Sequence, residues 1–199
     1  MPTQTMTPPS LAGLPGDWPT QGQWRYEDYL RLPDDDKRYE IIDGVLYVAN
    51  APGYDHQFTV GEITFHLQSF IRQQKLGIIL NAPFEVHLSE TSRPVQPDIL
   101  FLNNAQQPAP GAQVFTGAPT LIVEVISPSS IRLDRRVKFD AYEQAGVAEY
   151  WLADPKTRSV EVYILSNGEY ALFGQFTADE RITSQVLEGL TIQTSLLFN

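Results

Sequence analysis

The sequence places one acid in each of two apolar, strand-like runs. Asp98 follows a proline at the start of the run 99–102, and Glu124 interrupts the run 121–126. An unpaired carboxylate in a low-dielectric core costs several kcal/mol, so each acid requires a cation. If the two runs are adjacent strands, the acids lie near one sheet edge. There they supply two oxygen ligands for a hard divalent cation such as Mg²⁺.

Two further side chains decide whether these acids form a site. Glu40 could add a third ligand or hold a metal-bound water; its alternative is a solvated acid at a strand end. Lys138 lies about seven residues into the helix after Glu124, roughly 10 Å along the axis, and helical side chains lean back toward the N-terminus. Such a lysine orients an attacking water or stabilises an anionic transition state. The alternative is an exposed Lys138 paired with Asp134 at i−4.

Other chemistries have little support in the sequence. There is no cysteine, no Gly-rich phosphate loop and no G-x-S-x-G elbow. The three histidines, His56, His66 and His87, do not have a zinc-binding spacing. His56 falls in the first turn of a predicted helix, where a histidine more often makes a structural hydrogen bond than acts in catalysis.

The charge of the chain argues against a broadly basic DNA-binding surface. The net charge is −10, with 24 acids and 14 bases. A local positive patch is nevertheless predicted on the helix that carries Lys138, where Arg132, Arg135 and Arg136 cluster. The alternative for this cluster is a solvated helix face without a partner.

Length and composition predict one ordinary globular domain. Of the 199 residues, 42% are hydrophobic and 19% are charged. Residues 1–23, rich in Pro, Thr, Gly and Gln, are expected to form a flexible arm, and residues 24–199 a single domain. Neither a secretory signal nor an apolar run of roughly 18 to 20 residues is present, so we expect a cytoplasmic protein without a membrane span.

The elements that must position the acids follow from local patterns. Asp43-Gly44 between β-prone runs predicts a hairpin over 38–48. A strand at 121–126, a helix at 131–145 and a strand at 149–153 predict a βαβ unit with a parallel crossover. Further predicted elements are helices at 24–32 and 55–75 (Asp55 as N-cap, Gly77 as C-terminal stop), strands at 78–80, 84–88 and 99–102, a loop at 103–119, and a hairpin over 160–173.

These segments resemble one known family. Glu40-Ile41-Ile42-Asp43-Gly44, Gln96-Pro97-Asp98-Ile99, the run 123–130 from Val to Ser, Asp134 with Lys138 and Tyr142, and the run 146–152 together resemble the Uma-two family. That family comprises bacterial proteins described as "putative restriction endonucleases". It belongs to the restriction-endonuclease-like PD-(D/E)XK superfamily. The likeness covers about residues 24 to 199.

The resemblance implies an α/β fold with a restriction-endonuclease-like mixed central β-sheet of four core strands, flanked by helices and with added β-hairpins. It also implies Mg²⁺- or Mn²⁺-dependent cleavage of DNA. Glu40, Asp98 and Glu124 carry over as metal ligands and Lys138 as the catalytic lysine. One departure is that Ile126 stands where the superfamily pattern has lysine, so the lysine comes from the helix. We further expect the arginine cluster to contact DNA phosphates and the protein to form a homodimer.

Two other functions stay open at this point. The first is a binding or regulatory protein that keeps the nuclease fold with a weak or inactive site, which the acidic net charge favours. The second is a nuclease that acts on RNA or another phosphodiester, because nothing in the sequence is specific for 2′-hydroxyls or base edges.

Overall fold

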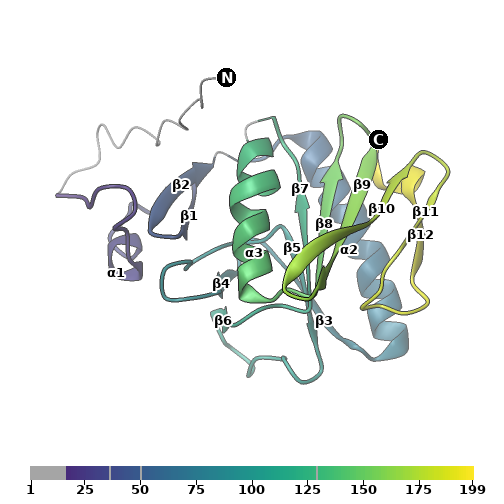
Figure 1. The fold of residues 1–199 in the computed structure, drawn as a ribbon, viewed down its shortest axis with the longest axis horizontal. Helices are drawn as coiled ribbons and strands as arrows, with labels where there is room; N and C mark the ends of the chain where they lie inside the picture. Colours follow the sequence, from purple (N-terminus) through teal and green to yellow (C-terminus); the bar gives the residue numbers. More distant parts are fainter. Residues whose placement is uncertain (1–16, 36, 50, 129) are drawn as a thin grey trace.

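A computed structural model describes residues 17–35, 37–49, 51–128 and 130–199, and a six-stranded sheet forms its centre (Figure 1). The strand order is β10-β9-β8-β7-β5-β3. In chain order the strands are β3 (Gly77–Asn81), β5 (Ile99–Asn103), β7 (Leu121–Val125), β8 (Glu149–Asp154), β9 (Ser159–Ser166) and β10 (Glu169–Thr177). Only β7 and β8 pair in parallel, as predicted for the βαβ unit, and the other neighbours in this sheet are antiparallel. The predicted mixed α/β sheet is confirmed, with six strands where four were expected.

Helices cover the two faces of the sheet (Figure 1). One face packs against α2 (Tyr54–Gln74), and the other against a π-helical turn, η1 (Leu133–Lys138), that continues into α3 (Phe139–Ala145). The predicted ends of the long helix were wrong. Gly53 is the N-cap in place of Asp55, and Lys75 ends the helix in the left-handed conformation (φ 56°), while Gly77 begins β3.

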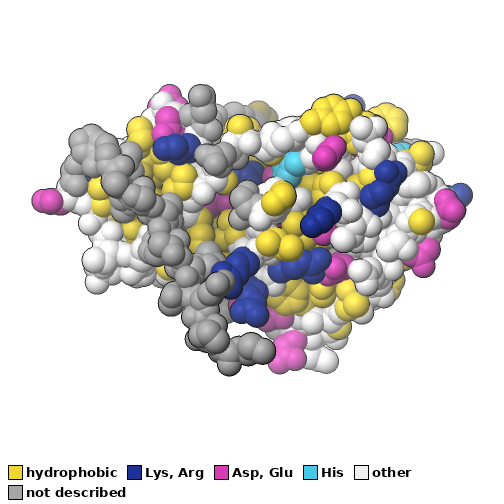
Figure 2. Space-filling model, turned by 90° about the horizontal axis from the view of Figure 1, so that it is seen from above, with side chains coloured by type: hydrophobic (Ala, Val, Ile, Leu, Met, Phe, Trp, Pro, Cys, Tyr) yellow, Lys and Arg dark blue, Asp and Glu magenta, His cyan; other side chains and the backbone are white. Residues whose placement is uncertain are grey.

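Charge is unevenly spread over the surface. Figure 2, which looks onto the upper end of the molecule in Figure 1, shows several Lys and Arg side chains near the middle of that face. The net charge of the whole chain is −10. Basic side chains therefore gather locally on this face although the chain as a whole is acidic.

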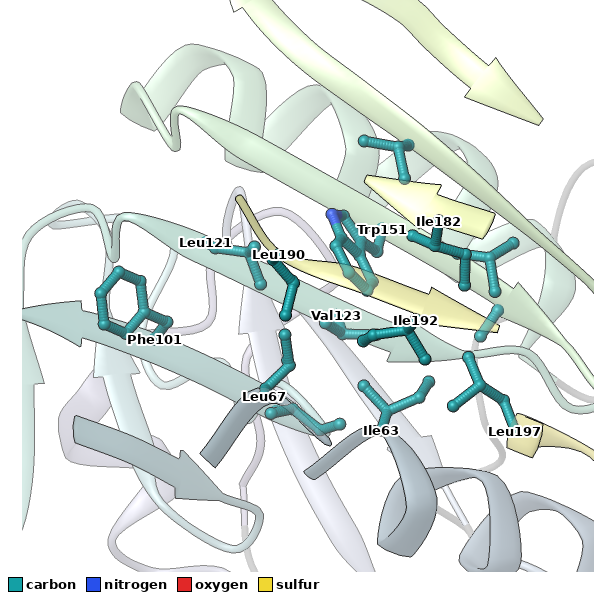
Figure 3. Packing of buried hydrophobic residues seen from close by; sticks show 14 of the residues in the cluster. Ile63, Leu67, Phe101, Leu121, Val123, Trp151, Ile182, Leu190, Ile192 and Leu197 are labelled. Carbon is teal, nitrogen blue, oxygen red and sulfur yellow. The ribbon is translucent and has the colours of Figure 1, made fainter. Parts of the chain in front are cut away.

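The alternation of side chains along the strands separates two cores. On the α2 side, Ile63 and Leu67 point toward Val123 of β7, together with Leu190 and Leu197 from the C-terminal segment (Figure 3). On the α3 side, residues at the intervening strand positions pack against Ala141 and Tyr142; they include Leu100, Ile122 and Leu152. Glu124 lies on this second face, because it alternates with Val123.

A hairpin of β1 (Arg38–Ile42) and β2 (Val45–Ala49) forms a separate two-stranded sheet. Its predicted Asp43-Gly44 turn is confirmed, with φ of 50° and 70°. The oxygen of Gly44 accepts hydrogen bonds from the amides of Gly22 and Trp24, both at 2.9 Å. Residues 17–23 of the predicted arm therefore pack on the hairpin, whereas residues 1–16 lie outside the described residues.

Short elements complete the described chain. The first helix, α1, is only Tyr26–Tyr29, shorter than the predicted 24–32. The predicted loop at 103–119 contains a strand, β6 (Val114–Thr116), which pairs in parallel with β4 (Glu85–His87). The C-terminal pieces are β11 (Arg181–Thr183), β12 (Thr191–Gln193) and a 3₁₀ turn, η2 (Thr194–Leu197). No helix in the described ranges is long and apolar enough to cross a membrane.

Candidate active site

Three of the predicted site residues meet at one buried point. The ammonium nitrogen of Lys138 lies 2.9 Å from Oε1 of Glu124 and 3.0 Å from Oε1 of Glu40. All three side chains are at most 2% exposed. The alternatives of a solvated Glu40 and an exposed Lys138 are therefore wrong.

The central sheet positions Asp98 and Glu124. Asp98 directly precedes β5, whose Ile99 pairs with Val123 of β7, so that Asp98 lies beside the Glu124 segment. Its Oδ2 accepts a hydrogen bond from the amide of Val125 at 2.9 Å. The predicted adjacency of the two acid-bearing strands is confirmed.

Glu40 enters the site from the hairpin. Its Oε1 accepts a hydrogen bond of 2.7 Å from the amide of Gln96, two residues before Asp98. The amide of Ile41 also donates to the oxygen of Pro94 at 2.9 Å. These contacts hold β1 against the segment that leads into β5.

Lys138 reaches the acids from the end of the π-helical turn. Residues 131–145 were predicted as one helix, but residues 133–138 form a π-helical turn with i→i+5 hydrogen bonding. Such turns are rare in proteins, and those that occur are often found at functional sites. The carbonyl oxygen of Asp134 accepts a hydrogen bond from the Tyr150 hydroxyl at 3.1 Å. The Asp134 side chain is also buried, with Oδ1 4.0 Å from the Lys138 nitrogen.

Three other residues contact the acids and were not identified as site residues. The Tyr142 hydroxyl donates to Oε1 of Glu124 at 2.6 Å. Arg38 donates to Oδ1 of Asp98 at 3.0 Å, and Nε2 of His56 lies 3.1 Å from Oδ2. Period-2 alternation along β1 places Arg38 on the face of Glu40, and that pattern could have identified it.

The site contains more acids than bases. Its four buried carboxylates face two cations: Glu40, Asp98, Glu124 and Asp134 against Arg38 and Lys138. When all of these groups are ionised, two negative charges remain in excess. Buried excess charge is costly, so the site either retains protons or takes up a cation.

The pKa values follow from this imbalance. Burial raises the pKa of Glu124 to about 8; Lys138 opposes the shift, and the neighbouring carboxylates add to it. Burial likewise raises the pKa of Asp134 to about 6. Burial also acts to raise the pKa of Asp98, but the His56 hydrogen bond and the Arg38 charge outweigh it and hold that pKa well below its usual range. Burial acts to lower the pKa of Lys138, but the negative charges of Glu124 and Glu40 raise it by more than burial lowers it. The pKa of Lys138 is therefore above its ordinary value, and the ammonium stays charged.

The donor set fits a hard cation held by few protein ligands. Oε2 of Glu124 is buried and has no hydrogen-bond partner among the described residues. Across those residues, however, no three His, Asp or Glu side chains group together as a ready metal site. Lys138 itself lies against both Glu40 and Glu124. Mg²⁺ commonly takes only one or two carboxylates, with water and phosphate as its other ligands, which suits this arrangement.

The arginine cluster is divided between two environments. Arg132 and Arg136 are exposed on the helix surface. Arg135 instead forms a bidentate pair with Glu161, with nitrogen–oxygen distances of 2.7 and 2.8 Å. Of the three arginines that were predicted to contact phosphates, Arg135 is therefore engaged by Glu161, whereas Arg132 and Arg136 lie on the exposed surface.

Comparisons with known proteins agree with the fold and identify the family. The model of the Uma2 family (Uma-two above), described as "Putative restriction endonuclease", matches residues 26–195. A solved structure described as "a putative nuclease belonging to DUF820" from Anabaena variabilis ATCC 29413 superposes with a TM-score of 0.74 at 20% identity. The match covers 87% of this chain and 96% of that one, and at this identity it shows the fold alone. A comparison with curated proteins finds no match.

Proposed function

Because the chain belongs to the Uma2 family, we propose that it is a metal-dependent endonuclease that hydrolyses DNA phosphodiester bonds. The observation that carries this proposal is the convergence of Lys138 with Glu40 and Glu124 inside the protein, at 3.0 and 2.9 Å. Asp98 lies beside them, on the segment whose backbone also binds Glu40. Three residues far apart in the sequence thus meet at one point, with Asp98 on the neighbouring segment.

The acids are proposed to hold the metal ion. Asp98 and Glu124 supply carboxylate oxygens, and Glu40 supplies a third oxygen or holds a water beside the ion. Mg²⁺ or Mn²⁺ bound there would lower the pKa of a water molecule and offset the charge of the phosphate. The unpartnered Oε2 of Glu124 is the atom best placed to serve as a ligand.

The cationic side chains are proposed to act on the substrate. Lys138 orients the attacking water and faces the negative charge that develops on the phosphate. Arg132 and Arg136, both exposed, contact phosphates that flank the cleaved bond. A homodimer would bring two such sites to the two strands of a duplex.

A plasmid-nicking assay tests the proposal. Wild type with Mg²⁺ or Mn²⁺ is compared with Asp98→Asn, Glu124→Gln and Lys138→Met. Asp140→Asn serves as the matched control, because Asp140 is an exposed acid on the same helix as Lys138. We expect nicking by wild type and the control, and a loss of at least 100-fold in the three site variants. Equal nicking by all five proteins would refute the assignment.

A second function, a binding or regulatory role, is favoured because Lys138 already pairs with two of the acids that would hold the metal ion. Lys138 already contacts both Glu40 and Glu124, and no ready three-residue metal site exists among the described residues. A binding or regulatory protein that keeps the nuclease fold would have such a site. Calorimetric titration with Mg²⁺ and Mn²⁺ separates the two, because only the nuclease requires cation binding.

A further inference from the structure

A cavity of about 650 Å³ lies directly beside the acids. Its inner wall includes Arg38, His56 and Asp98, so it opens onto the edge of the site where Asp98 is held. Its volume is within the range of about 300 to 1,000 Å³ typical of small-molecule sites. A double helix is far too wide to enter such a space, whereas a single nucleotide is of suitable size.

One buried nitrogen in this wall lacks a partner. His56 is 9% exposed, and its Nε2 is bonded to Asp98, but its Nδ1 has no hydrogen-bond partner among the described residues. Leaving a buried polar atom unpaired costs about 1 to 3 kcal/mol. Because Nδ1 itself has almost no exposed surface, a ligand in the cavity would pair with it only after the His56 side chain turns toward the cavity.

The beginning of α2 adds a site for an anion. Ala51 and Pro52 line the cavity just before the helix, and His56 lies in its first turn. Among the described residues no side chain caps the first turn after Gly53, so the first-turn amides of this 21-residue helix are left for another acceptor. Together with the guanidinium of Arg38, they favour a phosphate group.

The rest of the lining does not suit a bare phosphate. It includes Asp34 and Asp35, and Asp35 is partly neutralised by Lys37 at 3.5 Å. The side chains of Gln57 and Gln96 also line the cavity. Carboxylates and amides are the groups that pair with the edges of nucleobases. The lining therefore contains groups that suit a phosphate and groups that suit a base, and a nucleotide contains both.

We propose that this cavity holds one unstacked nucleotide of the DNA strand next to the cleaved bond. The phosphate of that nucleotide faces Arg38 and the first turn of α2, and its base faces the carboxylate and amide groups of the lining. The inference rests on the proposed nuclease function and specifies its substrate class: DNA with an unpaired segment. Unstacking a base costs a few kcal/mol in a duplex and least where the base is already unpaired.

Binding without metal tests the inference separately from catalysis. In EDTA, the fluorescence of 2-aminopurine in a 12-nucleotide single strand is titrated with protein, and the fully paired duplex is titrated in parallel. We expect at least tenfold tighter binding of the single strand, with a change in 2-aminopurine emission. Equal affinity for the two DNA forms would overturn the proposal.

Variants that place a bulky side chain at the cavity test the site, and a matched variant outside the cavity is the control. Ala51→Trp and Gln57→Trp each place an indole at the cavity, and both positions are exposed, so folding is preserved and is verified by circular dichroism. Gln73→Trp adds the same group to an exposed position at the far end of α2. We expect at least a tenfold loss of single-strand binding in the first two variants and none in the third. Unchanged binding in both cavity variants would refute the site.

The outcomes also separate this inference from the nuclease proposal. A protein that nicks plasmid DNA but binds single strands and duplexes equally keeps its function and loses the cavity assignment. A protein that binds single strands through the cavity but never cleaves DNA keeps the binding site and loses the nuclease assignment.

Discussion

The Tyr142 hydroxyl donates a 2.6 Å hydrogen bond to Oε1 of Glu124 inside the core. Lys138 binds the same oxygen at 2.9 Å, and both donors are fully buried. Oε1 is thus saturated, whereas Oε2 has no partner among the described residues. Burial raises the pKa of Tyr142 well above 10, so the hydroxyl remains a donor. Tyr142 therefore holds Glu124 with one oxygen committed and the other available.

Tyr142→Phe should weaken divalent cation binding. Partners that orient a metal ligand typically account for about 10- to 100-fold in affinity. We expect a loss in that range for Mn²⁺, measured by calorimetric titration. Tyr170→Phe is the control, because it also removes a largely buried hydroxyl, one that donates to the Val147 oxygen at 2.9 Å away from the acids. An equal loss in both variants would show that the effect is not specific to Glu124.

Lys138→Met should destabilise the fold. The change leaves Glu40 and Glu124 buried without their shared cation, and breaking a buried ion pair in this way costs about 3 to 5 kcal/mol. Urea unfolding at pH 8.5 measures the loss. Adding Glu124→Gln to Lys138→Met should recover part of it, since one buried charge is then removed. A single variant as stable as wild type would contradict the ion-pair assignment.

The stability of the metal-free protein should fall as pH rises from about 4.5 to 8. Glu124 has a folded pKa of about 8 against an ordinary 4.5, so in this window the unfolded chain loses the proton that the folded chain retains. For one such group the slope is at most about 1.4 kcal/mol per pH unit. Asp134, with a pKa of about 6 against 3.8, adds to the lower half of the window.

Urea unfolding at pH 5, 6.5 and 8 measures this slope. Glu124→Gln should flatten it, because the variant has no proton to retain. Glu161→Gln is the control: Arg135 lowers the Glu161 pKa, so Glu161 titrates below the window. A slope that persists in Glu124→Gln would assign the effect to another group.

Gly44→Ala should loosen the hairpin that carries Glu40. Gly44 has φ of 70°, and a Cβ there would lie 2.6 Å from the backbone oxygen of Gly22. Strain of this kind costs about 1 to 3 kcal/mol. Relative to wild type, we expect amide hydrogen exchange to become faster in β1 and β2 and to change less in β7 and β8. Gly61→Ala, in the interior of α2 with no atom within 4 Å of its Cβ, should have no such effect.

Local patterns sufficed to predict some parts of the fold and of the candidate site. The Asp43-Gly44 turn, the parallel pair of β7 and β8, and the adjacency of Asp98 and Glu124 all depend on short-range chemistry and known crossover geometry. The position of Lys138 on the helix after Glu124 made it a candidate, with an exposed lysine as the alternative, and the family resemblance favoured the meeting with Glu40 and Glu124 that the structure shows.

Other features depend on tertiary contacts that no local pattern contains. The π-helical turn at 133–138 has an ordinary helical sequence, and its Asp134 carbonyl is bonded by Tyr150 from β8. The strand β6 is three residues long and exists only through its pairing with β4. His56 was interpreted as a structural histidine from its place in a first helical turn, and its contact with Asp98, 42 residues away, is not visible in the sequence.

The placement of Lys138 between Glu40 and Glu124 makes the docking of two distant segments interdependent. Without the lysine, the hairpin would bring one buried carboxylate against another, and their repulsion would hold β1 away from the sheet. Without the hairpin, the ammonium would lose one of its two acids. During synthesis Glu40 precedes Lys138 by 98 residues and Glu124 precedes it by 14, so a growing chain contains both acids before the lysine. The site therefore closes only after the helix is made, and a partial chain contains the acids without an assembled site.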